Sequence, residues 1–397
     1  MGMAVISGYG RIAVVPKEDA DLTHVGIGTP MGELLRRYWQ PVCLSSEIDE
    51  LPKLVKVLGE ELVAFRDKRG RVGVLDAHCA HRGTSLEYGR IEEEGIRCCY
   101  HGWLFSVDGC CLQQPGEPPN SRYRDKVAQP AYPALEYGGL VFAYMGPLDK
   151  KPEFPLYDNL LKDSVELVAY RNVSRGRVAA CNWLQLEENA MDPIHTAVLH
   201  SGFSGVQFTQ IYSIIPQIAF EETAFGMKYI RTAKLPNGRT FVREQDVFVP
   251  NARSVADNIT PDDPHTQRST LIGWWVPVDD SHTIGFHTEA VRVVDGVRKA
   301  SNFLIAQEGR TSGTQEVHRS YEDTQRYPDD KQAQESQRPI AVHALEHLGA
   351  TDRGVTMFRN LLRRSLKAVA AGQDPQGVIR DPEKRVIPVV AGNTVMP

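Results

Sequence analysis

Two short segments of the sequence pair cysteine with histidine at spacings that suit metal binding. The first, LDAHCAHRG, places Cys79 and His81 one residue apart, and the second, GIRCCYHGWLF, offers Cys98 or Cys99 before His101. Sixteen residues separate His81 from Cys98, which gives the pattern C-x-H, sixteen residues, C-x-x-H. Thiolates on one iron and two imidazoles on the other can hold a [2Fe-2S] cluster, and the imidazoles raise its reduction potential. The spacing therefore selects Cys98, and not Cys99, as the second thiolate.

The same four side chains also suit a structural zinc site, because two cysteines and two histidines can hold tetrahedral Zn²⁺. Zinc-binding segments usually pair C-x-x-C with a separate histidine pair, rather than two mixed pairs. The spacing therefore favours the iron–sulfur interpretation. Colour and acid-labile sulfide would distinguish it from zinc.

The wider arrangement resembles the Rieske domain of ring-hydroxylating oxygenases. CAHRG, from Cys79, matches the family's C-x-H-R-G, and CCYHGW, from Cys98, matches its C-x-Y-H-G-W. Respiratory-type Rieske proteins add a disulfide between two further cysteines, and those positions here are Thr84 and Tyr100. The resemblance therefore implies a lower-potential cluster without a disulfide.

A third segment, NWLQLEENAMDPIHTAVLHSG, gathers carboxylates, an amide and two histidines. Glu188, Asp192 and His195 fall at i, i+4 and i+7, so on a helix they share one face, with Asn189 beside them. The pattern N-x-x-D-x-x-H-x-x-x-x-H resembles the mononuclear iron motif of the same oxygenases, from Asn189 to His200. Taken alone, such histidines are more often surface or core residues, and the upstream motif is what favours iron.

The spacing of the two histidines places a condition on the helix. His200 follows His195 by five residues, and on a regular α-helix this offset rotates the second imidazole away from the first by about 140°. Both can reach one metal only if the helix bends or ends between them, and Pro193 supplies a reason to bend. Two histidines and one carboxylate on non-haem Fe(II) leave positions open for dioxygen and substrate.

Several acids downstream could supply the carboxylate. The segment EDTQRYPDDKQAQESQ contains Glu322, Asp323, Asp329, Asp330 and Glu335. Family members place an aspartate early in a C-terminal helix, and Pro-Asp at 328–329 predicts a helix start, with a helical run to Gly349. The resemblance favours Asp330 over Asp329, and the acid that is not a ligand would be ordinary charge at a helix N-terminus.

The resemblance implies an electron-transfer chain that ends in oxygen activation. A flavin- or ferredoxin-type reductase, itself supplied by NAD(P)H, would reduce the [2Fe-2S] cluster. An electron would then reach Fe(II/III) at His195, His200 and Asp330, where bound O₂ attacks the substrate. The cofactors carry out the difficult chemistry, and the protein places them.

The resemblance also implies an assembly. In this family the two metal sites of one chain lie far apart, and transfer runs between neighbours in a head-to-tail ring, usually a homotrimer. Asp192 would then hydrogen-bond both His195 of its own subunit and His101 of the partner subunit, with Asn189 in the same catalytic motif. Such a carboxylate fixes the orientation of metal-bound imidazoles.

The ends of the chain narrow the resemblance. LTHVGIGTPMGELLRRYWQPV and HALEHLGATDRGV are similar to the phthalate dioxygenase and aryl O-demethylase branch, which takes aromatic acids or methoxylated aromatics. A substrate carboxylate needs a cation, ideally a bidentate arginine. Arg231 and Arg243, on either side of an Asn237-Gly238 turn, are the candidates. Either could instead be a solvated strand residue, and a mostly apolar pocket is the alternative.

The order of expected strands and helices along the sequence predicts an α+β protein. We expect residues 1–39 to form an N-terminal helical segment and residues 40–146, with short β runs split by turns, to form an all-β Rieske domain. We expect residues 147–397 to form the catalytic domain, in which a large antiparallel sheet packs on helices. That pattern matches the helix-grip fold of the same oxygenases.

Composition and charge exclude several classes of protein. The formal net charge of −5 offers no basic surface for nucleic acid. The N-terminus has no signal-peptide pattern, and no run of eighteen apolar residues occurs, so we expect a cytoplasmic protein that does not cross a membrane. The seven cysteines show no disulfide-framework spacing.

Two other function classes remain open at this point. A Rieske electron carrier would have the cluster but no oxygen site, and a helix-grip ligand carrier would bind no iron at His195 and His200. The sequence does not choose among dihydroxylation, monohydroxylation and oxidative demethylation.

Overall fold

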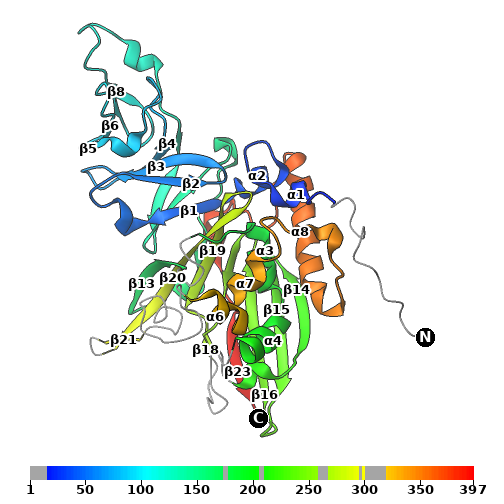
Figure 1. The fold of residues 1–397 in the computed structure, drawn as a ribbon. Helices are drawn as coiled ribbons and strands as arrows, with labels where there is room; N and C mark the ends of the chain where they lie inside the picture. The colour runs from blue at the N-terminus through cyan, green and yellow to red at the C-terminus, as the bar shows by residue number, and fades with distance from the viewer. Residues whose placement is uncertain (1–15, 173–177, 205–209, 258–266, 295–296, 300–318) are drawn as a thin grey trace.

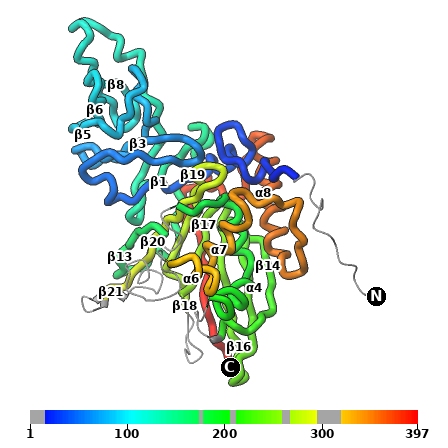
Figure 2. The backbone as a smooth tube through the Cα atoms, viewed as in Figure 1, coloured from blue at the N-terminus to red at the C-terminus, as the bar shows by residue number. Residues whose placement is uncertain are grey.

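A computed structural model describes residues 16–172, 178–204, 210–257, 267–294, 297–299 and 319–397. Figures 1 and 2 show an elongated lobe built from strands, which projects from a larger body of sheet and helices. The expected α+β class, with an all-β N-terminal part and an antiparallel catalytic sheet, is confirmed. None of the described helices is long and apolar enough to cross a bilayer.

Three small antiparallel sheets build the N-terminal lobe and its base. The base sheet has the order β1-β11-β10, and the other two have the orders β2-β3-β4-β9 and β5-β6-β7-β8. Their bounds are β1 Trp39–Leu44, β2 Lys53–Val57, β3 Glu60–Arg66, β4 Val72–Asp76, β5 Arg90–Glu92, β6 Gly95–Arg97, β7 Leu104–Phe105, β8 Cys111–Gln113, β9 Ala131–Tyr132, β10 Ala134–Tyr137 and β11 Leu140–Tyr144.

One ten-stranded antiparallel sheet forms the body. Its main path runs β13-β20-β19-β17-β16-β15-β14, with β18, β21 and β23 attached to it. The bounds are β13 Val165–Arg171, β14 Gln217–Thr223, β15 Gly226–Lys234, β16 Thr240–Phe248, β17 Ala252–Ser254, β18 Gln267–Arg268, β19 Leu271–Asp279, β20 His282–Val294, β21 Val297–Lys299 and β23 Gly392–Met396. A parallel pair, β12 Leu156–Tyr157 and β22 Val386–Ile387, lies apart from it. Gly238, with φ 83°, turns β15 into β16 as expected.

The helices lie along this sheet and at the N-terminus (Figure 1). Among the described residues the α-helices are α1 Ala20–Thr23, α2 Pro30–Leu35, α3 Trp183–Ala190, α4 Ile194–Val198, α6 Tyr321–Arg326, α7 Asp330–Glu335 and α8 Arg353–Ala370. Helix α2 begins as expected, because the Thr29 hydroxyl accepts a hydrogen bond from the Gly32 amide and Pro30 occupies the first turn.

One expectation about the C-terminal helices is wrong. The helical run predicted from Asp329 to Gly349 ends at Glu335. Arg338 has φ 93°, a left-handed conformation that no helix continues through. Pro339 follows it and lacks the amide that a helix interior needs. The next α-helix, α8, begins only at Arg353 and ends at Ala370.

A single hydrophobic core joins the N-terminal segment to the body. Buried residues of α2, β1 and β11 belong to the same cluster as residues of the large sheet and of α8, including Leu34, Phe142, Trp274 and Phe358. A separate cluster around Phe65 and Phe105 fills the outer lobe. The metal-binding segments of the lobe therefore rest on a small core of their own.

Candidate metal centres

Two matching turns of the outer lobe carry the first set of candidate ligands. The Cys79 amide donates to the Thr84 carbonyl, and the Cys98 amide donates to the Trp103 carbonyl, at 2.9 and 2.8 Å. Each turn contains a glycine four residues after its cysteine, with φ 74° at Gly83 and 73° at Gly102. Glycine adopts this left-handed conformation without strain. The two turns thus present their cysteines in equivalent backbone settings.

The structure brings Cys79 and Cys98 together and leaves Cys99 exposed. Burial, together with a hydrogen bond with the Cys98 thiol, raises the pKa of the Cys79 thiol to about 11. Two thiols held in contact in this way can both bind a metal once they are deprotonated. This arrangement agrees with the choice of Cys98 over Cys99.

The two histidines of the lobe complete the set. His81 and His101 lie with ring centroids 4.5 Å apart. Nδ1 of His81 is buried with no hydrogen-bond partner in the described residues, which is the state of a nitrogen directed at a metal. Burial lowers the pKa of His101, so its imidazole favours the neutral, metal-binding form.

These four residues fit a cluster better than a single ion. Among the described residues, two groups of three His, Cys, Asp or Glu side chains have ligand atoms that all lie within 4.8 Å of one another. The four candidate ligands of the lobe belong to neither group. A zinc ion needs all four atoms about 2.0–2.3 Å from one centre. The orphaned imidazole nitrogen and the paired thiols therefore suit a [2Fe-2S] cluster.

Gln129, which the sequence analysis missed, holds the first of these turns. Its side-chain amide donates to the carbonyls of Asp76 and His78, both at 2.9 Å, and accepts from the Ala80 amide at 2.7 Å. Gln129 is buried, so these bonds are sheltered from water. No sequence motif marks the residue, because it lies about fifty positions from the turn that it supports.

The second set of ligands sits where one helix gives way to another. Helix α3 ends at Ala190, and α4 begins at Ile194 after Pro193. The chain then widens into a π-helix over Leu199–Phe203. In that π-helical turn the Ser204 amide bonds the Leu199 carbonyl, an i→i+5 bond of 2.8 Å.

The helix changes from α to π between the two histidines, since His195 lies in α4 and His200 lies in the π-helix. The chain therefore departs there from the regular α-helix on which a five-residue offset would separate the imidazoles. Their ring centroids lie 5.2 Å apart. The expected bend at Pro193 is present but precedes both histidines, so the proline does not solve the spacing problem. Single π-turns of this kind are frequent at functional sites.

Asp330 completes a compact triad. Its Oδ1 lies 3.8 Å from Nε2 of His195 and 3.4 Å from Nε2 of His200. One atom from each of the three residues falls within 4.8 Å of the others. Burial lowers the pKa of His195, which keeps its imidazole neutral and available to a metal. The set of two histidines and one carboxylate suits non-haem iron.

Asp329, the other candidate for the carboxylate ligand, has a structural role instead. Its carboxylate accepts from the Lys331 amide at 2.9 Å, which caps α7, and pairs with Arg319 at 3.1 Å. Asn189 donates to Oδ1 of Asp330 at 3.3 Å. Asp330 is therefore held toward the histidines by Asn189, while Asp329 starts the helix.

Asp192 lies next to the triad without joining it. Its carboxylate accepts from the Ile194 amide at 3.0 Å, and its second oxygen is 3.9 Å from Nδ1 of His195. The same Nδ1 hydrogen-bonds the Asp192 backbone carbonyl. This contact fixes the ring so that Nε2 faces Asp330. The Asp192 carboxylate remains about one-third exposed.

Glu188 does not share the metal-facing side, contrary to expectation. The i, i+4, i+7 pattern fails because α3 and α4 are separate helices, so Glu188 points instead to Arg359 of α8. Arg359 makes four hydrogen bonds of 2.5–3.0 Å to Glu188 and Glu346. These two acids and His343 form the second group close enough for a metal, but the guanidinium satisfies both carboxylates. A charged residue within the apolar stripe of α8 was the sequence signal for this buried pair.

Arg231 and Arg243 lie directly opposite each other on β15 and β16, and both are buried. Arg243 donates to the Tyr212 hydroxyl at 2.9 Å and to backbone and amide oxygens nearby. Arg231 donates to the carbonyl of Tyr212 at 2.7 Å and lies 3.5 Å from the Thr196 hydroxyl, one residue from His195. Nε of Arg231 is buried without a partner in the described residues. Neither is a solvated strand residue.

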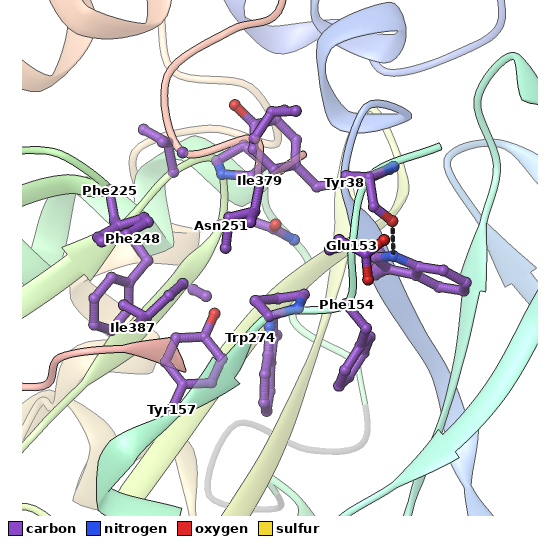
Figure 3. A pocket seen from close by; sticks show the side chains of 18 of the residues that line it. Tyr38, Glu153, Phe154, Tyr157, Phe225, Phe248, Asn251, Trp274, Ile379 and Ile387 are labelled. Atoms are coloured by element: carbon purple, nitrogen blue, oxygen red, sulfur yellow. Dashed lines mark hydrogen bonds between the residues drawn. The ribbon is translucent and has the colours of Figure 1, made fainter. Parts of the chain in front are cut away.

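An apolar pocket of about 40 Å³ opens on the other face of the sheet (Figure 3). Trp274 lines it together with Tyr157 and Phe248. The next residue, Trp275, packs on the opposite face against Leu186 of α3, the helix that carries Asn189. The pocket is therefore separated from the triad by the sheet, and it is too small for an aromatic ring, for which about 150 Å³ is needed.

Comparisons with known proteins agree with this geometry. Residues 38–133 match the Rieske [2Fe-2S] domain family. The chain is 41% identical to the phenoxybenzoate dioxygenase subunit alpha of Ectopseudomonas oleovorans, over 94% of this chain and 91% of the relative. It is 42% identical to the tert-butanol monooxygenase / tert-amyl alcohol desaturase oxygenase subunit of Aquincola tertiaricarbonis, over 92% and 79%.

The fold has solved counterparts as well. A structure of NdmA from Pseudomonas putida CBB5 with theobromine superposes with a TM-score of 0.66 at 22% identity, over 87% of this chain and 94% of that one. At this identity the likeness speaks for the fold alone. The curated relatives, together with the cysteine and histidine turns, carry the assignment: the chain belongs to the Rieske non-haem iron oxygenases, as a terminal oxygenase subunit of the alpha type.

Proposed function

We propose that this oxygenase holds its [2Fe-2S] cluster through Cys79, His81, Cys98 and His101, and its mononuclear iron through His195, His200 and Asp330. The triad carries the proposal, because its three ligand atoms already converge within 4.8 Å. When bound, the two centres supply electron relay and O₂ activation. An electron carrier or a ligand carrier would have no use for the second site.

The chain's own residues prepare that site. Asn189 orients the carboxylate of Asp330, and the backbone carbonyl of Asp192 orients His195. Metal ligands fixed in this way need little rearrangement when iron binds. The carboxylate of Asp192, about one-third exposed, meets His101 of the partner subunit in a head-to-tail homotrimer. A reductase or ferredoxin delivers the electrons.

The substrate we propose is an aromatic acid. Arg231 and Arg243 place two positive charges side by side on one face of the sheet, and their hydrogen-bond partners among the described residues are hydroxyl, amide and backbone oxygens, not carboxylates. Buried charges are normally compensated, and a substrate carboxylate would do so. Arg231 is the better candidate, because its Nε still has a hydrogen bond to give, whereas Arg243 bonds side-chain oxygens of Tyr212 and Asn393. One relative, named for phenoxybenzoate, takes such an acid.

A second substrate class has support from the other relative, which is named for tert-butanol and tert-amyl alcohol. Oxygen uptake by the reconstituted enzyme with a ferredoxin-type reductase separates the two classes. We expect turnover with 3-phenoxybenzoate, phthalate or vanillate, and about a hundredfold lower kcat/KM in Arg231→Met, as one charge-assisted hydrogen bond is lost. Turnover of tert-butanol alone, unaffected by that substitution, would contradict the aromatic acid. Product mass then distinguishes hydroxylation from demethylation.

A further inference from the structure

The indole ring of Trp103 covers one face of the His81 imidazole. The ring centroids are 4.3 Å apart and the planes differ by only 8°, a parallel stack. The other histidine, His101, meets Tyr100 at 3.9 Å with the rings tilted by 44°, and Tyr100 is 58% exposed. The two histidines are therefore covered unequally, and only His81 has a closed, buried cover.

The position of the indole is fixed by its surroundings. Trp103 is buried in the small core of the lobe. Its ring also contacts Phe105 and Tyr123, with centroids 6.3 and 6.2 Å away. Its carbonyl accepts from the Cys98 amide, which ties the indole to the second cysteine turn. The stack on His81 is thus part of the rigid frame of the cluster site and not a contact made by chance.

We propose that Trp103 lowers the reduction potential of the [2Fe-2S] cluster through its stack on His81. The proposal rests on the assignment of His81 as a cluster ligand. Trp103 acts here as a positioning and tuning residue, because it touches the ligand and not the iron.

The sign follows from charge. Two ferric ions, two sulfides, two thiolates and two neutral imidazoles sum to zero, and one added electron makes the cluster negative. The face of an aromatic ring carries negative charge density, so it opposes that electron. The buried indole also keeps water away, and a water-free shell disfavours the charged, reduced form. Both effects of Trp103 favour the oxidised cluster.

The test compares midpoint potentials of the full-length holoprotein, titrated anaerobically and followed by the visible and electron paramagnetic resonance spectra of the cluster. Trp103→Leu keeps an apolar side chain but removes the aromatic face. We expect its reduction equilibrium to shift about tenfold toward the reduced form, which is ~59 mV for one electron. Trp103→Phe restores a flat ring and should stay within about a factor of two of the wild type.

Tyr100→Leu is the matched control, because Tyr100 lies on the other histidine in an open, tilted contact. Its potential should move by less than half as much as that of Trp103→Leu. Equal shifts in both variants, or no rise in Trp103→Leu, would overturn the proposal.

A second measurement avoids the risk that Trp103→Leu fails to retain the cluster. Fluorinated tryptophan, supplied during expression, weakens the negative face without changing the ring's shape. The chain has five tryptophans, and Trp103 is the one in the described core of the cluster lobe. A higher potential supports the proposal, and an unchanged one overturns it. A wild-type protein without a Rieske spectrum would overturn the ligand assignment itself, which the spectra show before any variant is compared.

Discussion

Removing Arg359 should destabilise the protein far more than removing a neighbouring arginine on the same helix. The Arg359 side chain is 8% exposed and bonds both oxygens of Glu188, at 2.5 and 2.7 Å, and both of Glu346, at 2.5 and 3.0 Å. Arg359→Met keeps the stem and deletes the charge. Both carboxylates then lose their partner in a site where water replaces it poorly.

The expected cost is about 3–5 kcal/mol of unfolding free energy, because breaking a buried ion pair leaves an uncompensated charge. Glu188 dominates this cost, since its side chain is 12% exposed against 27% for Glu346. Burial already raises the pKa of Glu188, and losing Arg359 raises it further. A raised carboxyl pKa means that stability falls as pH rises through it, so the defect should be largest at neutral pH and shrink in acid.

Arg364→Met is the matched control. Arg364 lies on the same helix and pairs with Glu222 at 2.6 Å, but the two side chains are 53% and 41% exposed. A surface pair of this kind contributes about 0–1 kcal/mol. Urea unfolding at pH 7, with both variants and the wild type compared at equal m-value, measures the difference.

If Arg359→Met lowers the unfolding free energy no more than Arg364→Met does, the reasoning is refuted. A second check is the double variant Arg359→Met with Glu188→Gln, which removes the orphaned charge. It should recover more than half of the loss, and failure to do so would mean that the cost lies in packing and not in charge.

Three further predictions concern other buried residues. Glu187→Gln should remove a pH dependence of the unfolding free energy, because burial raises the pKa of Glu187 from 4.5 to about 7. The unfolding free energy of the wild type should fall by about 3 kcal/mol between pH 4.5 and 7 relative to the variant. Urea unfolding across that pH range measures the difference. Gln129→Leu leaves three backbone groups of the first cysteine turn unpaired at about 1–3 kcal/mol each, so the cluster should bleach several-fold faster on dilution into chelator, whereas an unchanged half-life would argue against the brace. Cys98→Ser should abolish the Rieske absorbance while Cys99→Ser retains it, and equal loss in both would show that the ligand assignment is wrong.

Much of the first metal site could be predicted from the sequence because it depends on local turns. Cys79, His81, Cys98 and His101 lie in two short loops whose spacing is set by the chain itself. The sequence alone could not decide between a cluster and a zinc ion, since that depends on whether the four ligand atoms converge on one point in the folded protein. Gln129 was invisible because a single polar side chain in a distant loop leaves no pattern.

The second site shows where periodicity fails. The five-residue spacing of His195 and His200 indicated an irregular helix, but no residue in it specifies a π-turn. The choice of Pro193 was wrong because a proline ends a helix before itself more readily than it widens the turn after itself. The predicted position of Glu188 was wrong because it assumed one continuous helix, whereas the structure has two separate helices, α3 and α4.

The sequence predicts least about the residues that would contact the substrate. Arg231 and Arg243 were correctly placed beside the Asn237-Gly238 turn, because a short hairpin sets its own register. Their contacts with Tyr212 depend on a segment that packs against the sheet and lies 19 residues before Arg231 and 31 residues before Arg243. Which hydrogen bonds remain for a substrate is therefore a tertiary property.

The central claim is that one chain holds two separate iron centres. The most direct test is iron and acid-labile sulfide per chain in anaerobically reconstituted wild type and in Asp330→Ala. We expect about three irons and two sulfides in the wild type, and about two of each in the variant with its colour intact. Colourless protein that takes up only zinc, or a variant that retains the third iron, would contradict the account.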